Sequence, residues 1–371
     1  LLHVITHLPI GGAQDNTLYT VELLNKKKYD ISLCCNLDGE LVERAKKVED
    51  IKLFDIPFLC REVSLYNDVK AFFSIYKLLK NGNFDIIHTH SSKAGFIARL
   101  AAKLNKIPVI IHTVHGFAFN DFMNVYKKNF FIYVEKILAT WTDVLITVSN
   151  LNKIVDLNIA KEENIKNIYS GIDLSLFTDK RNSDFRKELN LGDDKILIGS
   201  VGRLSNQKDP ITMINAFDIV SKKFPEAYLV LVGDGPLKDK IVDRIKKLKL
   251  KNRVHLTGNK SNPWDVYHSI DLFIMSSIYE GLGRSITEAL SCGVPVVCTA
   301  VEGVPEIIKD SITGTLVAPR EPIELADGII CSLQNMKVAK RKAAEGRKFV
   351  QDNFDVNKMV ENIDVLYQTL K

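Results

Sequence analysis

The sequence lacks any long hydrophobic run. No stretch approaches the roughly 18 uninterrupted apolar residues that a membrane-spanning helix needs. The first residues also lack the basic region followed by an apolar one that marks a secretion signal. These absences point away from an integral membrane protein and from a secreted one, so we expect a cytoplasmic protein.

Cysteine chemistry is equally sparse. The six cysteines form no Cys-x-x-Cys pair, and no histidine stands near them at the spacing of zinc ligands. Several lie in apolar, strand-like runs, so we expect buried, reduced thiols and no disulfide framework. The formal net charge of +5 is spread along the chain, which gives no support for a nucleic-acid partner.

What the sequence does contain is two series of alternating strand-like and helix-like segments. Its 371 residues are about twice the usual length of one domain. Short apolar runs separated by amphipathic stretches are typical of parallel sheets flanked by helices. The expected strands are LLHVITHL, DISLCCN, KLFDIP, FDIIHTH, PVIIHTV and DVLITVS in the first series, and KILIGSVGR, AYLVLVGDG, RVHLTG, DLFIMSS, PVVCTA and GTLVAP in the second.

We therefore predict an α/β protein with two Rossmann-like domains. The N-terminal domain is expected at residues 1–175 and the C-terminal domain at 195–345. Residues 176–194 lose the strand pattern and gain turn residues, which is typical of a linker. Residues 346–371 are expected to form a C-terminal helix that packs back toward the N-terminal domain.

A glycine-rich turn between two glutamates follows the run DLFIMSS, in the segment YEGLGRSITEAL at residues 279–290. Glycines let the backbone approach a ligand closely, and the start of the next helix offers unpaired N–H groups to a phosphate. Glu280 lies at the mouth of the turn. Glu288 follows about two helical turns later, where its carboxylate can meet ribose hydroxyls. The segment predicts an anion-binding site.

The E-x7-E spacing of these glutamates resembles the donor-site motif of glycosyltransferase family 4, whose members are retaining enzymes of the GT-B fold. Further segments resemble that family in the right order, namely PIGGAQ at residues 9–14, HTVHGF at 112–117, GIDLSLF at 171–177, GRLSNQK at 202–208, VGDGP at 232–236, CGVPVV at 292–297 and GVPE at 303–306. The resemblance covers most of the chain. It implies two facing Rossmann-like domains and a nucleotide-diphosphate sugar as donor.

The resemblance also implies roles for individual residues. It gives His115 and Glu280 as the residues that hold the transferred sugar, and a donor site made of Gly12, Arg203, Lys208, Asn259, Gly283, Arg284, Ser285 and Glu288. Arg203 offers a planar fork and Lys208 a mobile point charge to the diphosphate. Because no enzymic nucleophile is evident, the resemblance implies front-face attack, in which the departing phosphate accepts the acceptor's proton.

No Asp-x-Asp occurs in the sequence. That motif is the usual metal clamp of the other large glycosyltransferase fold, so we expect no metal and no other cofactor.

Two assignments stay open. Arg284 stands where the family often has Asn or an apolar residue, and it can either meet a polar sugar substituent or point into solvent, which we favour. His88 and His90 end an expected strand, where open α/β sheets bind ligands. They can contact the acceptor or serve as hydrogen-bonded structural histidines, and a metal site is less favoured.

An aromatic stretch at residues 117–141 is interleaved with lysines. Its members are Phe119, Phe122, Tyr126, Phe130, Phe131 and Tyr133, with Lys127, Lys128 and Lys136. The stretch can lie on a membrane surface, although we expect most of these aromatics in the core. A lipid-linked acceptor would fit peripheral contact with the inner face of the plasma membrane.

The prediction is a hexosyltransferase that moves a sugar from a nucleotide sugar, expected to be a UDP-sugar, to a glycan or polyprenyl-diphosphate-linked acceptor. A sugar-nucleotide 2-epimerase shares the architecture and is the alternative; it would release epimerised donor without an acceptor. A dehydrogenase is disfavoured because Gly233-Asp234-Gly235-Pro236 lacks a third glycine. A two-lobed solute receptor is disfavoured because no secretion signal is seen.

Overall fold

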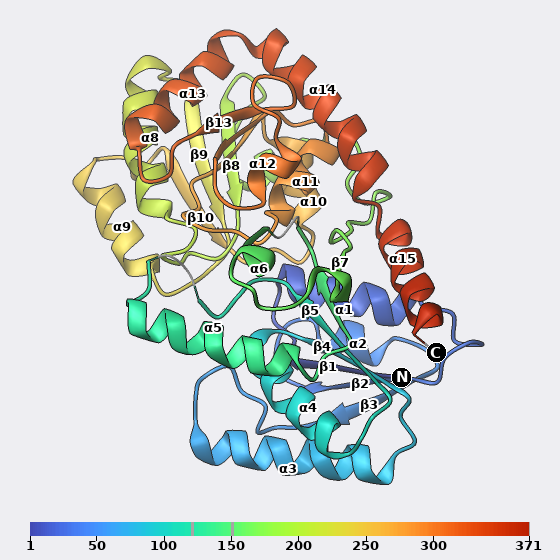
Figure 1. The fold of residues 1–371 in the computed structure, drawn as a ribbon. Coiled ribbons are helices and arrows are strands. Elements are labelled where there is room, and N and C mark those ends of the chain that lie inside the picture. Colours follow the sequence, from blue (N-terminus) through green and yellow to red (C-terminus); the bar gives the residue numbers. More distant parts are fainter. Residues whose placement is uncertain (120–121, 150–151, 371) are drawn as a thin grey trace. The chain divides into compact units, whose positions relative to one another are not determined.

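The computed structural model describes residues 1–119, 122–149 and 152–370. The chain forms two compact units, Leu1–Gly171 together with Val356–Lys371, and Ile172–Asp355. Each unit is built on one parallel sheet flanked by helices (Figure 1). The predicted α/β class is confirmed.

The first unit has a seven-stranded sheet in the order β3-β2-β1-β4-β5-β6-β7. Its strands are β1 (Leu2–His7), β2 (Ile31–Asn36), β3 (Ile51–Asp55), β4 (Ile86–His90), β5 (Val109–Val114), β6 (Val144–Thr147) and β7 (Ile165–Asn167). Its helices are α1 (Gly12–Leu23), α2 (Val42–Lys46), α3 (Leu65–Asn81), α4 (Ser92–Leu104), α5 (Val125–Ala139), α6 (Asn152–Asp156), the 3-10 turn η1 (Glu162–Asn164) and α15 (Val356–Thr369).

Alternation along the strands decides which helices cover which face of this sheet. Leu2 and Val4 of β1 belong to a core cluster with residues of α3 and α4, which lie on one side of the sheet in Figure 1. Ile86 of β4 belongs to another cluster, with residues of α1 and α15. His3 therefore points to the α15 face, opposite to its neighbours Leu2 and Val4.

The second unit has a six-stranded sheet in the order β10-β9-β8-β11-β12-β13. Its strands are β8 (Ile196–Val201), β9 (Ala227–Val232), β10 (Val254–Gly258), β11 (Leu272–Met275), β12 (Val296–Thr299) and β13 (Thr315–Val317). Its helices are α7 (Asp184–Glu188), α8 (Pro210–Lys223), α9 (Lys238–Lys247), α10 (Pro263–Ser269), α11 (Arg284–Ser291), α12 (Val304–Ile307), α13 (Pro322–Gln334) and α14 (Met336–Asn353).

The start of α8 shows how local sequence fixes an element that positions the site. Asp209 caps the helix, and its Oδ1 accepts from the backbone N–H of Thr212 at 3.3 Å. Pro210 stands at the first helical position, where its missing N–H is not needed. Lys208 is therefore held directly before a well-defined helix start.

The unit boundaries differ from the expected ones. Residues 176–194 lie within the second unit and contain α7, so they are not a bare linker. Position 345 falls inside α14, which stays with the second unit, and the chain re-enters the first unit at Val356. An amphipathic pattern shows that a helix packs against something, but it does not show which sheet the helix covers.

Each of the twelve expected strands corresponds to a strand of the structure, and the short strand β7 was not predicted. β7 has only three residues, none of them buried. The cysteines follow the expectation in part: Cys34, Cys35, Cys292 and Cys298 are buried, Cys60 is half-buried and Cys331 is exposed.

Candidate functional site

Polar groups of the second unit gather where its strands end. Arg203 follows β8, Glu280 follows β11 and Asn259 follows β10. The order of the strands reverses at β8, which lies between β9 and β11. Open α/β sheets bind ligands at the carboxyl edge beside such a switch point. The residues predicted from the sequence therefore lie at the candidate site of this unit.

Lys208 and Glu280 form an ion pair at this edge. The carboxylate of Glu280 is only 8% exposed, and Ser277 donates a second hydrogen bond to the same oxygen, Oε1, at 2.7 Å. Within the described part of the chain, Oε2 of Glu280 accepts no hydrogen bond. The Lys208 ammonium has three N–H donors, so it can hold Glu280 and an anionic ligand together.

Glu288 is held by two partners on the other side of the glycine turn. Its Oε1 accepts from Nε of Arg284 at 3.1 Å, and its Oε2 accepts from the hydroxyl of Tyr267 at 2.8 Å. Burial and the nearby carboxylate raise the pKa of Tyr267 well above its usual value, so this phenol stays a donor. The carboxylate of Glu288 is thereby fixed in direction.

Arg284 does not point into solvent, and that favoured expectation is wrong. Its side chain is 12% exposed and pairs with Glu288 one helical turn later. The pair follows from the i, i+4 spacing within α11, which brings two side chains onto the same helix face. The sequence contained this signal.

The turn before α11 depends on a glycine. Gly283 adopts a φ of +87°, and a Cβ at this position would lie 2.9 Å from Cδ1 of Ile286. In the described ranges no side chain caps the N-terminus of α11. Ser285, in the first turn, is half-buried. The start of α11 thus presents backbone N–H groups and the positive end of the helix dipole.

Arg203 and Asn259 lie at the surface of this edge, and both residues are exposed. The turn after β9 packs against the loop that carries Arg203 and holds it by a backbone hydrogen bond. A Cβ on Gly233 would lie 2.1 Å from the carbonyl oxygen of Gly202, and Leu204 donates its N–H to the carbonyl of Asp234 at 3.0 Å. Only glycine permits this approach.

The first unit presents its own predicted residues at the carboxyl edge of its sheet. Gly12 begins α1 after the loop that follows β1, and His115 follows β5. His115 is half-buried, and its Nε2 lies 3.2 Å from Nδ1 of His90. β1, β4 and β5 are neighbours in the sheet, so the ends of these strands meet at one place.

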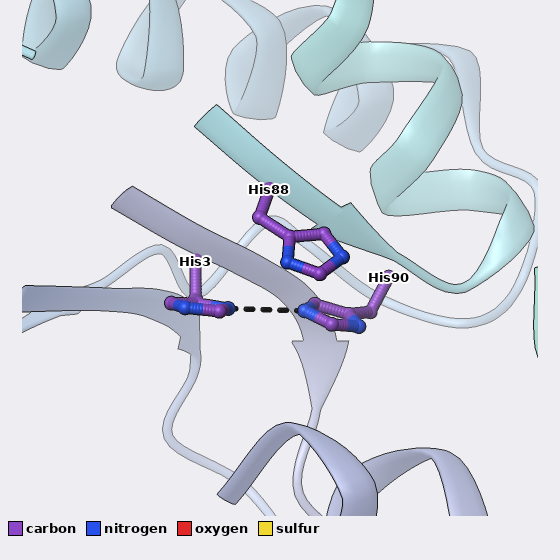
Figure 2. Close-up of side chains that lie close together, drawn as sticks. All are labelled: His3, His88 and His90. Carbon is purple, nitrogen blue, oxygen red and sulfur yellow. Dashed lines mark hydrogen bonds between the residues drawn. The ribbon is translucent and has the colours of Figure 1, made fainter. Parts of the chain in front are cut away.

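His88 and His90 are completely buried, and this argues against direct contact with an acceptor. Figure 2 shows them beside His3, with their rings close together. His88 lies 2.6 Å from Oγ1 of Thr113, and His90 Nε2 lies 3.1 Å from His3 Nδ1. Of the two roles left open for His88 and His90, the hydrogen-bonded structural role agrees with this geometry.

A hollow of about 800 Å³ lies elsewhere in the first unit. It is lined by Leu1, Asp30, Asp85 and Ile86, among others, which stand at the amino ends of β1, β2 and β4. Ligands of parallel sheets bind at the carboxyl ends, so size alone does not make this hollow the functional site.

Three residues that hold the predicted groups were missed by sequence reasoning. They are Tyr267, Ser277 and Glu302, whose Oε2 accepts from the backbone N–H of Glu280 at 3.0 Å. Ser277 lies three residues before Glu280, so its proximity was readable. Tyr267 and Glu302 lie on other elements, and nothing in the sequence pairs them with the glutamates.

The aromatic stretch is mostly exposed, contrary to expectation. Tyr126, Phe130 and Tyr133 are 83%, 60% and 64% exposed, whereas Phe119 is buried. Asn120 and Asp121 of this stretch lie outside the described residues. The exposed side chains recur at intervals of four and three residues, which places them on one face of α5.

Two Rossmann-like units with polar and charged groups at the carboxyl edges of their sheets are the architecture expected of a glycosyltransferase of the GT-B type. Comparison with known families agrees. Residues 10–176 match Glycosyltransferase Family 4, and residues 181–349 match Glycosyl transferases group 1. The chain belongs to glycosyltransferase family 4.

Similar proteins are named as glycosyltransferases. The chain is 31% identical to UDP-Gal:alpha-D-GlcNAc-diphosphoundecaprenol alpha-1,3-galactosyltransferase of Escherichia coli, over 99% of this chain and 96% of that one. It is 26% identical to the capsular polysaccharide biosynthesis glycosyltransferase CapM of Staphylococcus aureus, over 94% and 92%. The predicted enzyme class, a hexosyltransferase, is confirmed.

Solved structures confirm the fold. HepE of Anabaena, solved in complex with UDP and glucose, superposes with a TM-score of 0.83 at 20% identity, over 99% of this chain and 98% of that one. Sucrose-phosphate synthase from Thermosynechococcus elongatus gives 0.86 at 21% identity, over 100% and 98%. Among the helices described here, none is both long and apolar enough to cross a membrane.

Proposed function

We propose that this enzyme transfers a hexose from a UDP-sugar to a hydroxyl of a polyprenyl-diphosphate-linked glycan, with retention of the anomeric configuration. The observation that carries this proposal is the Lys208–Glu280 pair beside Arg203 at the switch point between β8 and β11. The E. coli relative is named for a UDP-sugar donor and a diphosphoundecaprenol acceptor, which supports these substrate classes.

In this proposal the second unit binds the nucleotide. Arg203, Lys208 and the N–H groups at Gly283, Arg284 and Ser285 bind the diphosphate, which carries the charge that helix starts and cations attract. Glu288, held by Arg284 and Tyr267, accepts hydrogen bonds from the ribose hydroxyls. Asn259 lies beside the base.

Glu280 and His115 hold the transferred sugar, and the backbone at Gly12 lies against the donor phosphate. The free Oε2 of Glu280 accepts from a sugar hydroxyl, while its Oε1 keeps Lys208 near the phosphates. Lys208 thus separates two anionic groups that would otherwise repel each other.

The chemical step needs no covalent enzyme intermediate. The bond from the anomeric carbon to the phosphate oxygen breaks, and the bond from that carbon to the acceptor oxygen forms on the same face. The acceptor proton passes to the departing phosphate. The enzyme contributes orientation and stabilisation of charge on the leaving diphosphate.

We also propose that the reaction is independent of metal ions and of other cofactors. Arg203 and Lys208 supply two positive charges where a metal would otherwise stabilise the leaving group. The sequence offers no Asp-x-Asp clamp.

The exposed face of α5 supports peripheral contact with a membrane. Tyr126, Phe130 and Tyr133 form an apolar and aromatic stripe, with Lys127 exposed beside it. Aromatic rings insert at the interface, and lysines attract anionic headgroups. Such a surface would bring the enzyme to an acceptor that is anchored in the bilayer.

The test is a transfer assay with UDP-galactose, UDP-glucose, UDP-N-acetylglucosamine and GDP-mannose, each with a GlcNAc-diphosphate-lipid acceptor, with and without EDTA. We expect a UDP-sugar to be used, EDTA to have no effect, and the product to carry an α linkage by NMR. A β linkage contradicts retention, and loss of activity in EDTA contradicts metal independence. Conversion of the donor to its epimer without acceptor would establish the 2-epimerase instead.

A further inference from the structure

Three imidazole rings form a hydrogen-bonded chain that ends at His115. Nε2 of His115 lies 3.2 Å from Nδ1 of His90, and Nε2 of His90 lies 3.1 Å from Nδ1 of His3. The contact between His3 and His90 is drawn in Figure 2. His3 and His90 are fully buried, so the chain runs from the core of the first unit to its carboxyl edge.

The chain continues to the C-terminal helix. Nε2 of His3 lies 3.5 Å from the hydroxyl of Tyr367 on α15, and the same hydroxyl lies 2.5 Å from Nδ1 of His88. Nε2 of His88 contacts Oγ1 of Thr113 at 2.6 Å. Each contact joins side chains of the first unit, and every ring nitrogen of His3, His88 and His90 takes part in one.

The buried rings are neutral. Burial lowers the pKa of His3 to about 3 and lowers the pKa values of His88 and His90 well below their usual range. A neutral imidazole carries one proton, so one nitrogen donates while the other accepts. The position of the proton on one ring therefore dictates its position on the next.

If the Tyr367 hydroxyl donates within this chain, two arrangements satisfy every contact. In the first, every ring carries its proton on Nε2. His115 then donates to His90, His90 to His3, and His3 to the oxygen of Tyr367, whose hydroxyl donates to Nδ1 of His88. In the second arrangement every donor is reversed and every ring carries its proton on Nδ1. The first is favoured because it lets the Tyr367 hydroxyl donate across its short contact, 2.5 Å to Nδ1 of His88, rather than across the 3.5 Å contact to Nε2 of His3.

We propose that His90, His3 and Tyr367 are positioning residues that fix the proton of His115 on Nε2. In the neutral His115 ring Nδ1 then carries no proton, so any hydrogen bond at that atom is one that His115 accepts. The link to the transferred sugar rests on the proposed function. The tautomer itself is a property of the unliganded first unit and can be measured without any transfer reaction.

The grouping of His3, His88 and His90 also has the ligand atoms of a three-histidine metal site, all within 4.8 Å of one another. The hydrogen-bonded arrangement explains the structure better. Each ring nitrogen of the three already has a partner, and a divalent cation would lie in a fully buried place with no carboxylate among these ligands to balance its charge.

The experiment is long-range ¹H–¹⁵N NMR of the full chain labelled with ¹⁵N-histidine, which distinguishes a protonated ring nitrogen from a bare one. We expect His115, His90, His3 and His88 each to show protonated Nε2 and bare Nδ1. In His90→Leu, His115 should change from one tautomer to a mixture. Protonation of His115 on Nδ1, or an unchanged single tautomer in His90→Leu, overturns the proposal.

Two further variants guard against misfolding. Tyr367→Phe removes only a hydroxyl and should shift the ¹⁵N signals of His3 and His88. Tyr29→Phe is the matched control, because its hydroxyl bonds Asp364 on the same helix but lies outside the chain of imidazoles. It should leave the histidine signals unchanged, and equal shifts in both variants would contradict the relay.

Activity and metal content give independent readouts. In His90→Leu we expect kcat to fall about tenfold, the lower end of what losing an outer partner of a functional histidine costs at metal sites, with UDP affinity unchanged. An equal loss of UDP affinity would contradict a role through His115. Stoichiometric zinc in the purified protein that is lost in His90→Leu would replace the relay by a metal site.

Discussion

Acid should destabilise the first unit steeply, because it buries four neutral histidines. They are His3, His88, His90 and His112, and burial is the largest cause that lowers the pKa of each. The unfolded chain binds protons at these rings near pH 6.5, but the folded chain does not. Their contribution to stability is complete above that pH and is lost as the pH falls toward the folded pKa values.

The magnitude follows from proton linkage. Each histidine lowers the free energy of unfolding by about 1.4 kcal/mol per pH unit within this window, and four together by about 5 kcal/mol per unit. Since a domain is usually stable by roughly 5–15 kcal/mol, we expect the first unit to unfold between about pH 4 and 5.5. Carboxylates contribute only toward the lower end of this range.

The two tryptophans allow each unit to be followed separately. Trp141 belongs to the first unit and Trp264 to the second. Urea unfolding of Trp264→Phe, followed by fluorescence from pH 7.5 to 5, should show the steep loss in the first unit. In Trp141→Phe the second unit should lose less, because it holds two histidines of lowered pKa, His255 and His268, and not four. Constant stability of the first unit from pH 7 to 5.5 would refute this reasoning. In His90→Leu, the slope of the free energy of unfolding of the first unit against pH should fall by the equivalent of one proton.

Three further predictions concern the site and the membrane. Lys208→Ala should weaken UDP binding about 10- to 150-fold by calorimetry, the equivalent of one charge-assisted hydrogen bond, and unaltered affinity would remove Lys208 from the phosphate site. Glu280→Gln should lower kcat about 10²- to 10³-fold while the melting temperature stays within a few degrees; unchanged turnover would exclude Glu280 from the mechanism. Phe130→Asp should reduce sedimentation with anionic vesicles without changing transfer to a water-soluble acceptor. Phe73→Asp, at an exposed position on α3, is the control. Equal losses of sedimentation in both variants would argue against membrane contact through α5.

The sequence predicted what is local. Strand-like runs, the glycine turn and the i, i+4 relation of Arg284 and Glu288 all follow from spacing along a few residues. The alternation in IIHTH also places His88 and His90 on one face of β4, because side chains two apart share a face. These features need no knowledge of the rest of the chain.

Contacts between distant segments could not be predicted. Tyr367 meets His88 across 279 residues, and Glu302 meets Glu280 across 22. Such partners depend on which helix or loop covers which strand end, and hydrophobic periodicity does not specify it. The C-terminal helix was expected to pack toward the N-terminal domain, but the point at which the chain re-enters the first unit, Val356 rather than residue 346, could not be read from the amphipathic pattern.

The burial of the predicted groups bears on how the enzyme would use them. Glu280 and Glu288 are not open carboxylates that await a ligand, since each already accepts two hydrogen bonds from side chains of its own unit. Their direction is therefore set before a donor arrives, and a bound sugar or ribose would meet lone pairs that need no rearrangement. His115 fits the same principle, because its tautomer is dictated by neutral rings beneath it. Preorganised groups of this kind stabilise a transition state without being reoriented during the reaction, so substitutions beneath the site should lower kcat more than they weaken nucleotide binding.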